Sequence, residues 1–292
     1  MAMPHPFKVE DYSNIEIVLR ADTNGPNLQL EEIWRYRDLF LILIWRDFSA
    51  KYKQTILGPL WFLLQPIMMT LVFTVIFAHV AGVSTDGLPP LLFYLCGQLG
   101  WNYFAANISS NSTIFITNAG LFSKVYFPRL VVPLAALISN LFTFFIQASA
   151  FLIFYFYFKI ILRMTGFGMD LRALFLPLLI LQTAALSLGF GLLFSALTAK
   201  YRDLMHALGM MIQIWMYGTP IILPLSEFPA KWQWIVALNP MTMIVESFRL
   251  ALLGTGTVLP QYVAGSVGCT ILVLAGGAIL FGKVERTIVD TV

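Results

Sequence analysis

Long apolar stretches follow one another along the chain and are separated mostly by short polar connections. A membrane-spanning helix needs about 20 mostly apolar residues. Stretches of roughly this length lie at residues 56–79, 88–110, 131–158, 174–198, 205–224 and 260–282. The pattern therefore predicts an all-α integral membrane protein, with six transmembrane helices in a domain at 55–285 and a polar segment at 1–30 before it.

A shorter apolar run, LFLILIW at 39–45, does not fit this pattern. Seven helical residues cover only about 10 Å, so the run cannot cross a bilayer. Charged residues bracket it, and Trp34, Leu41, Trp45, Phe48 and Tyr52 recur at helical spacing along one face. We expect an amphipathic helix at 31–54 that lies in the headgroup layer at the cytoplasmic side and continues directly into the first span.

The connection between the fifth and sixth spans contains two apolar runs that are each too short to span. Pro229 and Pro240 precede or begin them and Gly254 follows the second, as expected at helix ends. We predict two short re-entrant helices at 226–254 on the outer side. Glu246 and Arg249 lie three residues apart there and can pair. A pair at the surface is the simpler expectation.

Composition and charge support a membrane protein and orient it. Hydrophobic residues make up 59% of the chain and charged residues 11%, with a mean hydropathy of +0.79. Soluble proteins carry about 25% charged residues. More Lys and Arg residues flank the spans on the side that holds both termini than on the other side. The positive-inside rule therefore places both termini in the cytoplasm.

The spans lack the residues that catalysis or ion coupling requires. They contain almost no Asp, Glu, Lys or Arg, which argues against a proton-coupled transporter and against a membrane enzyme with a paired acid and base. Gly277 to Lys283 matches G-x-x-x-x-G-K, but Val284 follows where a phosphate-binding loop has Ser or Thr. We expect no bound metal or cofactor in this chain.

Amides and aromatic rings share faces of the predicted spans. Sugar rings stack on aromatic side chains and accept hydrogen bonds from amides, so such faces suit a passage that binds each sugar weakly. For the second-span set Tyr94, Gln98 and Trp101, packing between helices is an equally good alternative. The candidate lining residues are Trp61, Gln65, Tyr94, Gln98, Trp101, Gln213 and Tyr217.

Several segments, taken together and in order, resemble one family. RYRDLFLILIWRDFSAKYKQTILGPLWFLLQP (35–66), SKVYFPR (123–129), KYRDLMHAL (200–208), YGTPIILP (217–224) and LNPMTMIVESFR (238–249) resemble the type-two ABC exporter permeases. The resemblance is strongest to the branch that exports lipid-linked polysaccharides, such as O-antigen, capsule or wall teichoic acid. It runs from about residue 30 to 285, and residues 1–30 show no recognisable resemblance.

The resemblance implies a transporter subunit of the bacterial inner membrane that is not itself an enzyme. It would pair with a second copy of itself and with two ATP-binding subunits, which hold ATP and Mg. A glycan linked to undecaprenyl pyrophosphate would pass outward through a channel between the two copies. No nucleic acid is implied. The alternative is a permease of the same superfamily that exports a small hydrophobic compound or a lipid.

The resemblance also suggests roles for individual segments. The helix at 31–54 would rest on the ATP-binding subunit and tilt the first span, with Gly58-Pro59 as the bend, and the loop at 111–129 would carry a coupling helix. The helices at 226–254 would form an outer gate that includes Glu246 and Arg249. The cations placed to meet the pyrophosphate at the entrance, or else to form a lipid-anchoring cluster, are Arg46, Lys51, Lys53 and Arg129.

Overall fold

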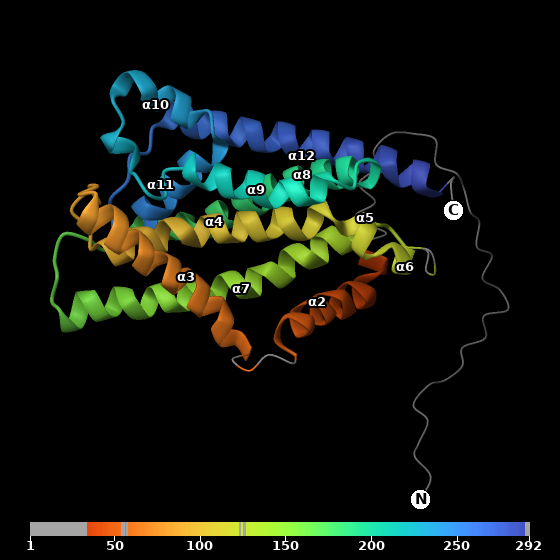
Figure 1. The fold of residues 1–292 in the computed structure, drawn as a ribbon, viewed down its shortest axis with the longest axis horizontal. Coiled ribbons are helices and arrows are strands. Elements are labelled where there is room, and N and C mark those ends of the chain that lie inside the picture. The colour runs from red at the N-terminus through yellow and green to blue at the C-terminus, as the bar shows by residue number, and fades with distance from the viewer. Residues whose placement is uncertain (1–33, 54–55, 57, 123, 125–126, 290–292) are drawn as a thin grey trace, which may run out of the picture.

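The protein is a bundle of long helices with short helices at both ends (Figure 1). The structure is a computed structural model, and it describes residues 34–53, 56, 58–122, 124 and 127–289. Within these ranges every regular element is a helix or a helical turn, which agrees with the predicted all-α class. The predicted polar segment at 1–30 lies outside the described residues.

Among the residues that the structure describes, four helices are long and apolar enough to cross a membrane, and a bent pair of shorter helices at 230–253 would make a fifth span if it counts as one. The first is α3 (Trp61–Phe73), which continues as the π-helical segment η2 (Thr74–Val80). The second is α7 (Val131–Phe156), which continues as η3 (Tyr157–Ile161). The third is α8 (Leu176–Lys200), preceded by the 3-10 turn η4 (Leu171–Phe175). The fourth is α12 (Pro260–Val289), so four of the predicted spans match helices of spanning length and composition.

The other two predicted spans have different properties. Helix α4 (Pro90–Ser112) has 23 residues, but it carries several amides and falls outside this apolar group. Helix α9 (Leu204–Tyr217) has 14 residues, which corresponds to about 21 Å of α-helix. A hydrocarbon core is about 30 Å thick. The count of six spans therefore remains a prediction.

The predicted interface helix is present as α2 (Arg37–Tyr52), but it does not run directly into the first span. The backbone of Lys53 is extended, and α3 begins only after a 3-10 turn, η1 (Gly58–Leu60). Gly58 has φ +51°, a conformation that glycine adopts without steric cost. The expected continuous rod is wrong for this reason, whereas the break at Gly58-Pro59 is confirmed.

Helix α2 has an exposed apolar face and a buried apolar face. Trp45 on the first face is 67% exposed, and Leu41 is exposed beside it. Leu43 and Ile44 on the second face are buried in a cluster with residues of α7, α8 and α12. A helix with this distribution packs on the bundle and still presents a large apolar surface to its surroundings.

Two short helices lie at the end of the bundle opposite α2 (Figure 1). These are α10 (Ala230–Ala237) and α11 (Pro240–Leu253), which follow the turn η5 (Leu225–Glu227) and are bent relative to each other by 106°. Pro240 begins α11, and Gly254 ends it in the left-handed conformation with φ +77°. The two predicted short helices are confirmed, and their placement in the outer leaflet remains a prediction.

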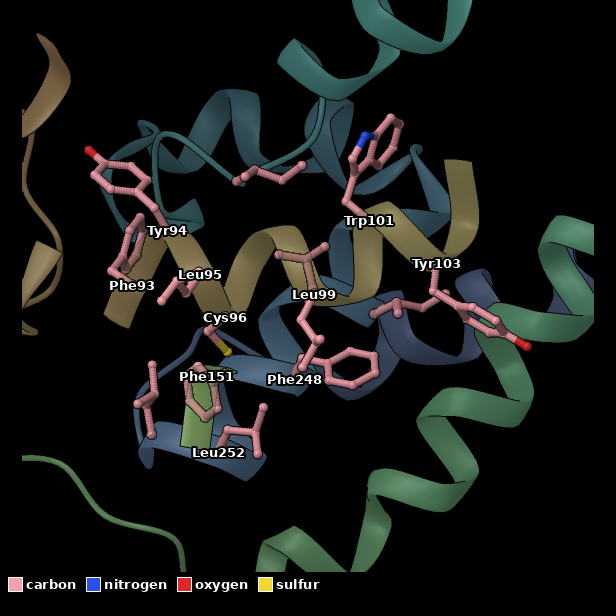
Figure 2. Close-up of a cluster of buried hydrophobic side chains, with 14 of the residues drawn as sticks. Phe93, Tyr94, Leu95, Cys96, Leu99, Trp101, Tyr103, Phe151, Phe248 and Leu252 are labelled. Carbon is pink, nitrogen blue, oxygen red and sulfur yellow. The ribbon is translucent and has the colours of Figure 1, made fainter. Parts of the chain in front are cut away.

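Helix α4 lies at the centre of the bundle and contacts α7, α8 and α11. Its apolar side chains form the main core, and Figure 2 shows Cys96 of α4 pointing toward Phe151 of α7 and Leu252 of α11. Between α4 and α7 the chain forms two single-turn helices, α5 (Ile114–Thr117) and α6 (Ala119–Phe122). These lie at the same end of the bundle as α2 (Figure 1).

Candidate functional site

A polar cavity lies where α2 meets the bundle. Its volume is about 370 Å³, and its walls come from α2, the C-terminal end of α4, α5 and the first half of α7. Both charged and uncharged polar groups line it. The lining residues are Arg46, Asp47, Ala50, Lys51, Ser110, Ile114, Thr117, Asn118, Val132, Ala136, Ser139 and Asn140.

Lys51 connects this cavity to a buried chain of polar side chains. Its Nζ donates to Oδ1 of Asn140 on α7 at 2.6 Å, and Nδ2 of Asn140 donates to Oδ1 of Asn107 on α4 at 2.8 Å. Nδ2 of Asn107 then donates to Oγ of Ser187 on α8 at 3.1 Å. Each amide is satisfied by the next group, so the chain ties α2 to three helices of the bundle.

Burial lowers the pKa of Lys51 below its ordinary value, and the carboxylate of Asp47 partly opposes this shift. The loss of hydration therefore lowers the pKa of the Lys51 ammonium group more than the charge of Asp47 raises it. A second anion beside it would favour the charged form.

The other predicted entrance cations have different surroundings. Arg46 pairs with Asp47 at 2.8 Å and donates to Oδ1 of Asn118 at 3.2 Å, so it shares the cavity with Lys51. Lys53 is exposed beyond the end of α2. Arg129 is buried and donates through Nη1 to the carbonyl oxygen of Glu285 at 3.1 Å. The structure thus brings together two of the four cations, and Lys53 and Arg129 lie outside the cavity lining.

Three predicted lining residues are buried inside this single chain. Figure 2 shows Tyr94 and Trp101 among the core side chains of α4. Gln98 is also buried, and its Nε2 donates to Oγ1 of Thr70 on α3 at 3.0 Å. The ring of Trp101 lies 6.3 Å from that of Trp215 on α9. These contacts favour the packing alternative, because a passage between two copies must be lined by side chains that each copy exposes.

The other predicted lining residues are accessible. Trp61 and Gln65 are exposed on α3, and Gln213 and Tyr217 are exposed on α9. Apolar side chains are exposed around them on both helices, including Met68 and Ile214. These surfaces are available to lipid or to a second copy, and their role in lining a channel remains a prediction.

Glu246 and Arg249 form a salt bridge, but it is buried and not at the surface. Their side chains are 0% and 1% exposed, and Oε1 of Glu246 lies 2.8 Å from Nη1 of Arg249. The expectation of a surface pair is wrong because α11 packs this face against α4. The guanidinium lies 3.9 Å from the centroid of the Phe93 ring.

Backbone groups of two connecting segments add to this buried network. The N–H groups of Leu225 and Thr257 donate to Glu246 at 3.2 and 3.0 Å, and Nη2 of Arg249 donates to the carbonyl oxygen of Ile221 at 3.0 Å. A Cβ at Gly97 of α4 would lie 3.1 Å from Nη2 of Arg249, so glycine leaves room for the guanidinium. Sequence spacing indicated the pair itself, but no local signal indicated these partners.

Comparison with known proteins identifies the family. Residues 38–253 match the family model described as ABC-2 type transporter. The chain belongs to the ABC-2 type transporter family. For an ABC-2 permease, membership implies partner subunits that bind ATP, and it agrees with the apolar spans of a multi-pass membrane protein.

Curated relatives match over most of their length. The chain is 26% identical over 249 residues to the O-antigen export system permease protein RfbA of Klebsiella pneumoniae, covering 85% of this chain and 92% of the relative. The protein of the same name from Myxococcus xanthus is 26% identical over 223 residues, which covers 75% of this chain and 82% of that relative. The polysialic acid transport protein KpsM of Escherichia coli is 23% identical over 234 residues, with 80% and 85% covered.

Proposed function

We propose that this chain is the transmembrane subunit of an ATP-driven exporter that moves a lipid-linked polysaccharide from the cytoplasm outward. Two copies would form the channel, and two ATP-binding subunits would supply the energy. The observation that carries the proposal is the near full-length match to a relative named for O-antigen export, at 85% of this chain and 92% of the relative. The match to a polysialic acid transport protein supports an extended glycan as the cargo.

The placement of the short helices supports a docking face for the ATP-binding subunits. Helices α2, α5 and α6 lie at one end of the bundle (Figure 1). This is the end that the positive-inside rule assigns to the cytoplasm. We infer that the subunit rests on α2 and on the α5–α6 segment. Because Lys51 bonds to Asn140, movement of α2 would act on α7 as well as on α3.

The exposed faces of α3 and α9 support a channel between two copies. Trp61, Gln65, Gln213 and Tyr217 offer the rings and amides that suit a sugar chain, and all four are accessible. At the cytoplasmic entrance, Lys53 is exposed outside the cavity, and we assign it to the diphosphate of the lipid carrier. At the other end, α10 and α11 would form the outer gate, held to α4 by Glu246 and Arg249.

The proposal is tested by deleting the gene in its host and measuring where the lipid-linked glycan accumulates. We expect the glycan to build up on the cytoplasmic side and to disappear from the surface. A plasmid copy of the wild type should restore export, and a copy with Trp61→Ala should restore less. Leu174→Ala, which changes an exposed apolar residue on η4, is the matched control and should restore export fully.

The opposite pattern would favour the alternative cargo. If surface glycan is unchanged in the deletion strain while a small hydrophobic compound accumulates inside the cells, the polysaccharide assignment is wrong.

A further inference from the structure

The cavity between α2 and α7 carries a positive charge that its own residues do not neutralise. Three of its lining residues are charged, namely Arg46, Asp47 and Lys51. Asp47 lies 2.8 Å from Arg46, so this carboxylate is already paired. The short hydrogen bond of Lys51 goes to the neutral amide of Asn140. The charged lining groups therefore sum to a single positive charge in a partly desolvated site.

The same cavity holds a buried hydroxyl group without a partner. Ser139 is 0% exposed and lines the cavity, and its Oγ has no hydrogen-bond partner among the residues that the structure describes. Buried polar groups are nearly always hydrogen-bonded, so an unpaired hydroxyl facing a cavity points to an absent partner. A hydroxyl donor that lines the same cavity as two cations suits the oxygen atoms of a phosphate group.

The surroundings of the cavity are those of the bilayer boundary. On α2, Trp45 is exposed one residue before Arg46, and on α7 Phe142 and Phe145 are exposed within two turns of Ser139. Exposed aromatic residues beside cations are typical of the headgroup layer. Acyl chains lying along the exposed rings of α7 would place a headgroup at the level of the cavity.

We propose that this cavity binds the phosphate of one bilayer phospholipid, with Arg46 and Lys51 as its charge partners and the Ser139 hydroxyl as a hydrogen-bond donor. A phosphodiester carries one negative charge and matches the single positive charge of the site. A diphosphate carries more negative charge and would be left partly uncompensated. The volume of about 370 Å³ is near the lower limit for small-ligand pockets and suits one headgroup.

The bound headgroup would join α2 to α7 through contacts additional to the bond between Lys51 and Asn140. It would set how firmly α2, the helix on which we expect the ATP-binding subunit to rest, is held on the bundle. The inference goes beyond the proposed function and does not depend on which compound is exported, because none of these residues belongs to the exposed faces of α3 and α9.

Native mass spectrometry of the full-length protein purified in detergent tests the inference. The protein is titrated separately with phosphatidylglycerol, with diacylglycerol that has the same acyl chains but no phosphate, with inorganic phosphate and with undecaprenyl diphosphate. We expect the binding that depends on Lys51 to be saturable for phosphatidylglycerol, absent for diacylglycerol and weaker for the other two. Lys51→Met should weaken phosphatidylglycerol binding about tenfold or more, in line with the loss of one charge-assisted contact. Lys200→Met is the matched control, because Lys200 is exposed in the last turn of α8 and lies outside the cavity lining, and this variant should bind as the wild type does.

Two further variants keep the test decisive if Lys51→Met disturbs the fold. Lys51→Arg preserves the charge and should retain most of the binding, and Ser139→Ala removes only the unpaired hydroxyl and should weaken binding by a smaller factor. Thermal unfolding of each variant shows whether it is folded.

Four results would overturn the inference. The first is equal binding of phosphatidylglycerol and diacylglycerol, and the second is equal effects of Lys51→Met and Lys200→Met. The third is inorganic phosphate binding as tightly as the lipid. The fourth is undecaprenyl diphosphate binding at this site more tightly than phosphatidylglycerol. The third would assign the cavity to a free anion, and the fourth would assign it to the carrier of the cargo. A failure of the proposed function is distinguishable from a failure of this inference: unchanged surface glycan in the deletion strain, with phospholipid binding by the purified protein intact, would refute the proposed function alone.

Discussion

The buried salt bridge between Glu246 and Arg249 gives the sharpest prediction about stability. Replacing Arg249 with methionine keeps much of the side-chain volume but leaves the Glu246 carboxylate without a counter-charge at 0% exposure. Removing one partner of a buried pair costs about 3–5 kcal/mol, because the other charge stays desolvated. Two backbone N–H groups still donate to this carboxylate, at 3.2 and 3.0 Å. We therefore expect a loss near the lower end, about 3 kcal/mol.

Glu246→Gln leaves the opposite defect. The guanidinium keeps its bond to the Ile221 carbonyl and its contact with the Phe93 ring, but it loses the only carboxylate within salt-bridge distance among the described residues. We expect a loss of about 2–4 kcal/mol. The double variant, which combines Glu246→Gln with Arg249→Met, has no charge at either position, and the new amide oxygen can still accept one backbone N–H bond. It should be more stable than either single variant.

The assay is unfolding of the purified full-length protein in mixed micelles, followed by tryptophan fluorescence as the denaturing detergent is increased. The double-mutant cycle then gives the coupling between the two side chains, which we expect to exceed about 1.5 kcal/mol. If each single variant costs less than about 1 kcal/mol, or if the two losses simply add, the pair does not hold α11 to α4 and the reasoning is refuted.

Three further predictions concern packing, the core of α4 and topology. Gly277→Ala should destabilise the protein by about 1–3 kcal/mol, because a Cβ there overlaps the Gly189 carbonyl on α8. Gly276→Ala has open space around its Cβ and should be neutral in the same unfolding assay. Equal effects of the two changes would disprove the close approach of α8 and α12. Trp101→Ala should lower the free energy of unfolding by about 3–5 kcal/mol and reduce export and ATP hydrolysis together. The control Trp232→Ala changes an exposed ring and should leave stability unchanged. A loss of export alone would return Trp101 to the predicted sugar path. Cysteines placed at Ser84 and Lys231 should react with an impermeant maleimide from outside intact cells, and one placed at Lys53 only after lysis; labelling in the reverse order would invert the topology.

Features that depend on local sequence were predicted well. Helix α11 begins at Pro240 and ends before Gly254, as expected. Proline in the first turn and glycine after the last turn act through the backbone of only a few residues. The apolar length of α3, α7, α8 and α12 likewise predicted long helices, since a spanning helix must satisfy its own backbone hydrogen bonds.

Features that depend on which helices meet were not predictable from one sequence. Periodicity places Tyr94, Gln98 and Trp101 near one another on α4, but it does not say whether another helix of the same chain covers them. The same limit applies to Arg249, whose burial results from Phe93, Gly97 and Ile221, all more than 25 residues away in sequence.

The path from α2 to the spans also differs from the sequence-based expectation. A continuous rod was predicted, but the backbone turns at Gly58, and the side chain of Lys51 reaches Asn140 on α7 instead. A lysine near the end of an amphipathic helix carries no sequence signal for a partner 89 residues away.

The central claim is that this chain moves a lipid-linked glycan when an ATP-binding partner drives it. The most direct measurement uses inside-out vesicles that contain this protein and the ATP-binding subunit from its host, with a radiolabelled lipid-linked glycan added outside. The account predicts that the glycan becomes protected inside the vesicles only when ATP and both subunits are present. Protection of the glycan without the ATP-binding subunit, or no protection under any of these conditions, would contradict it.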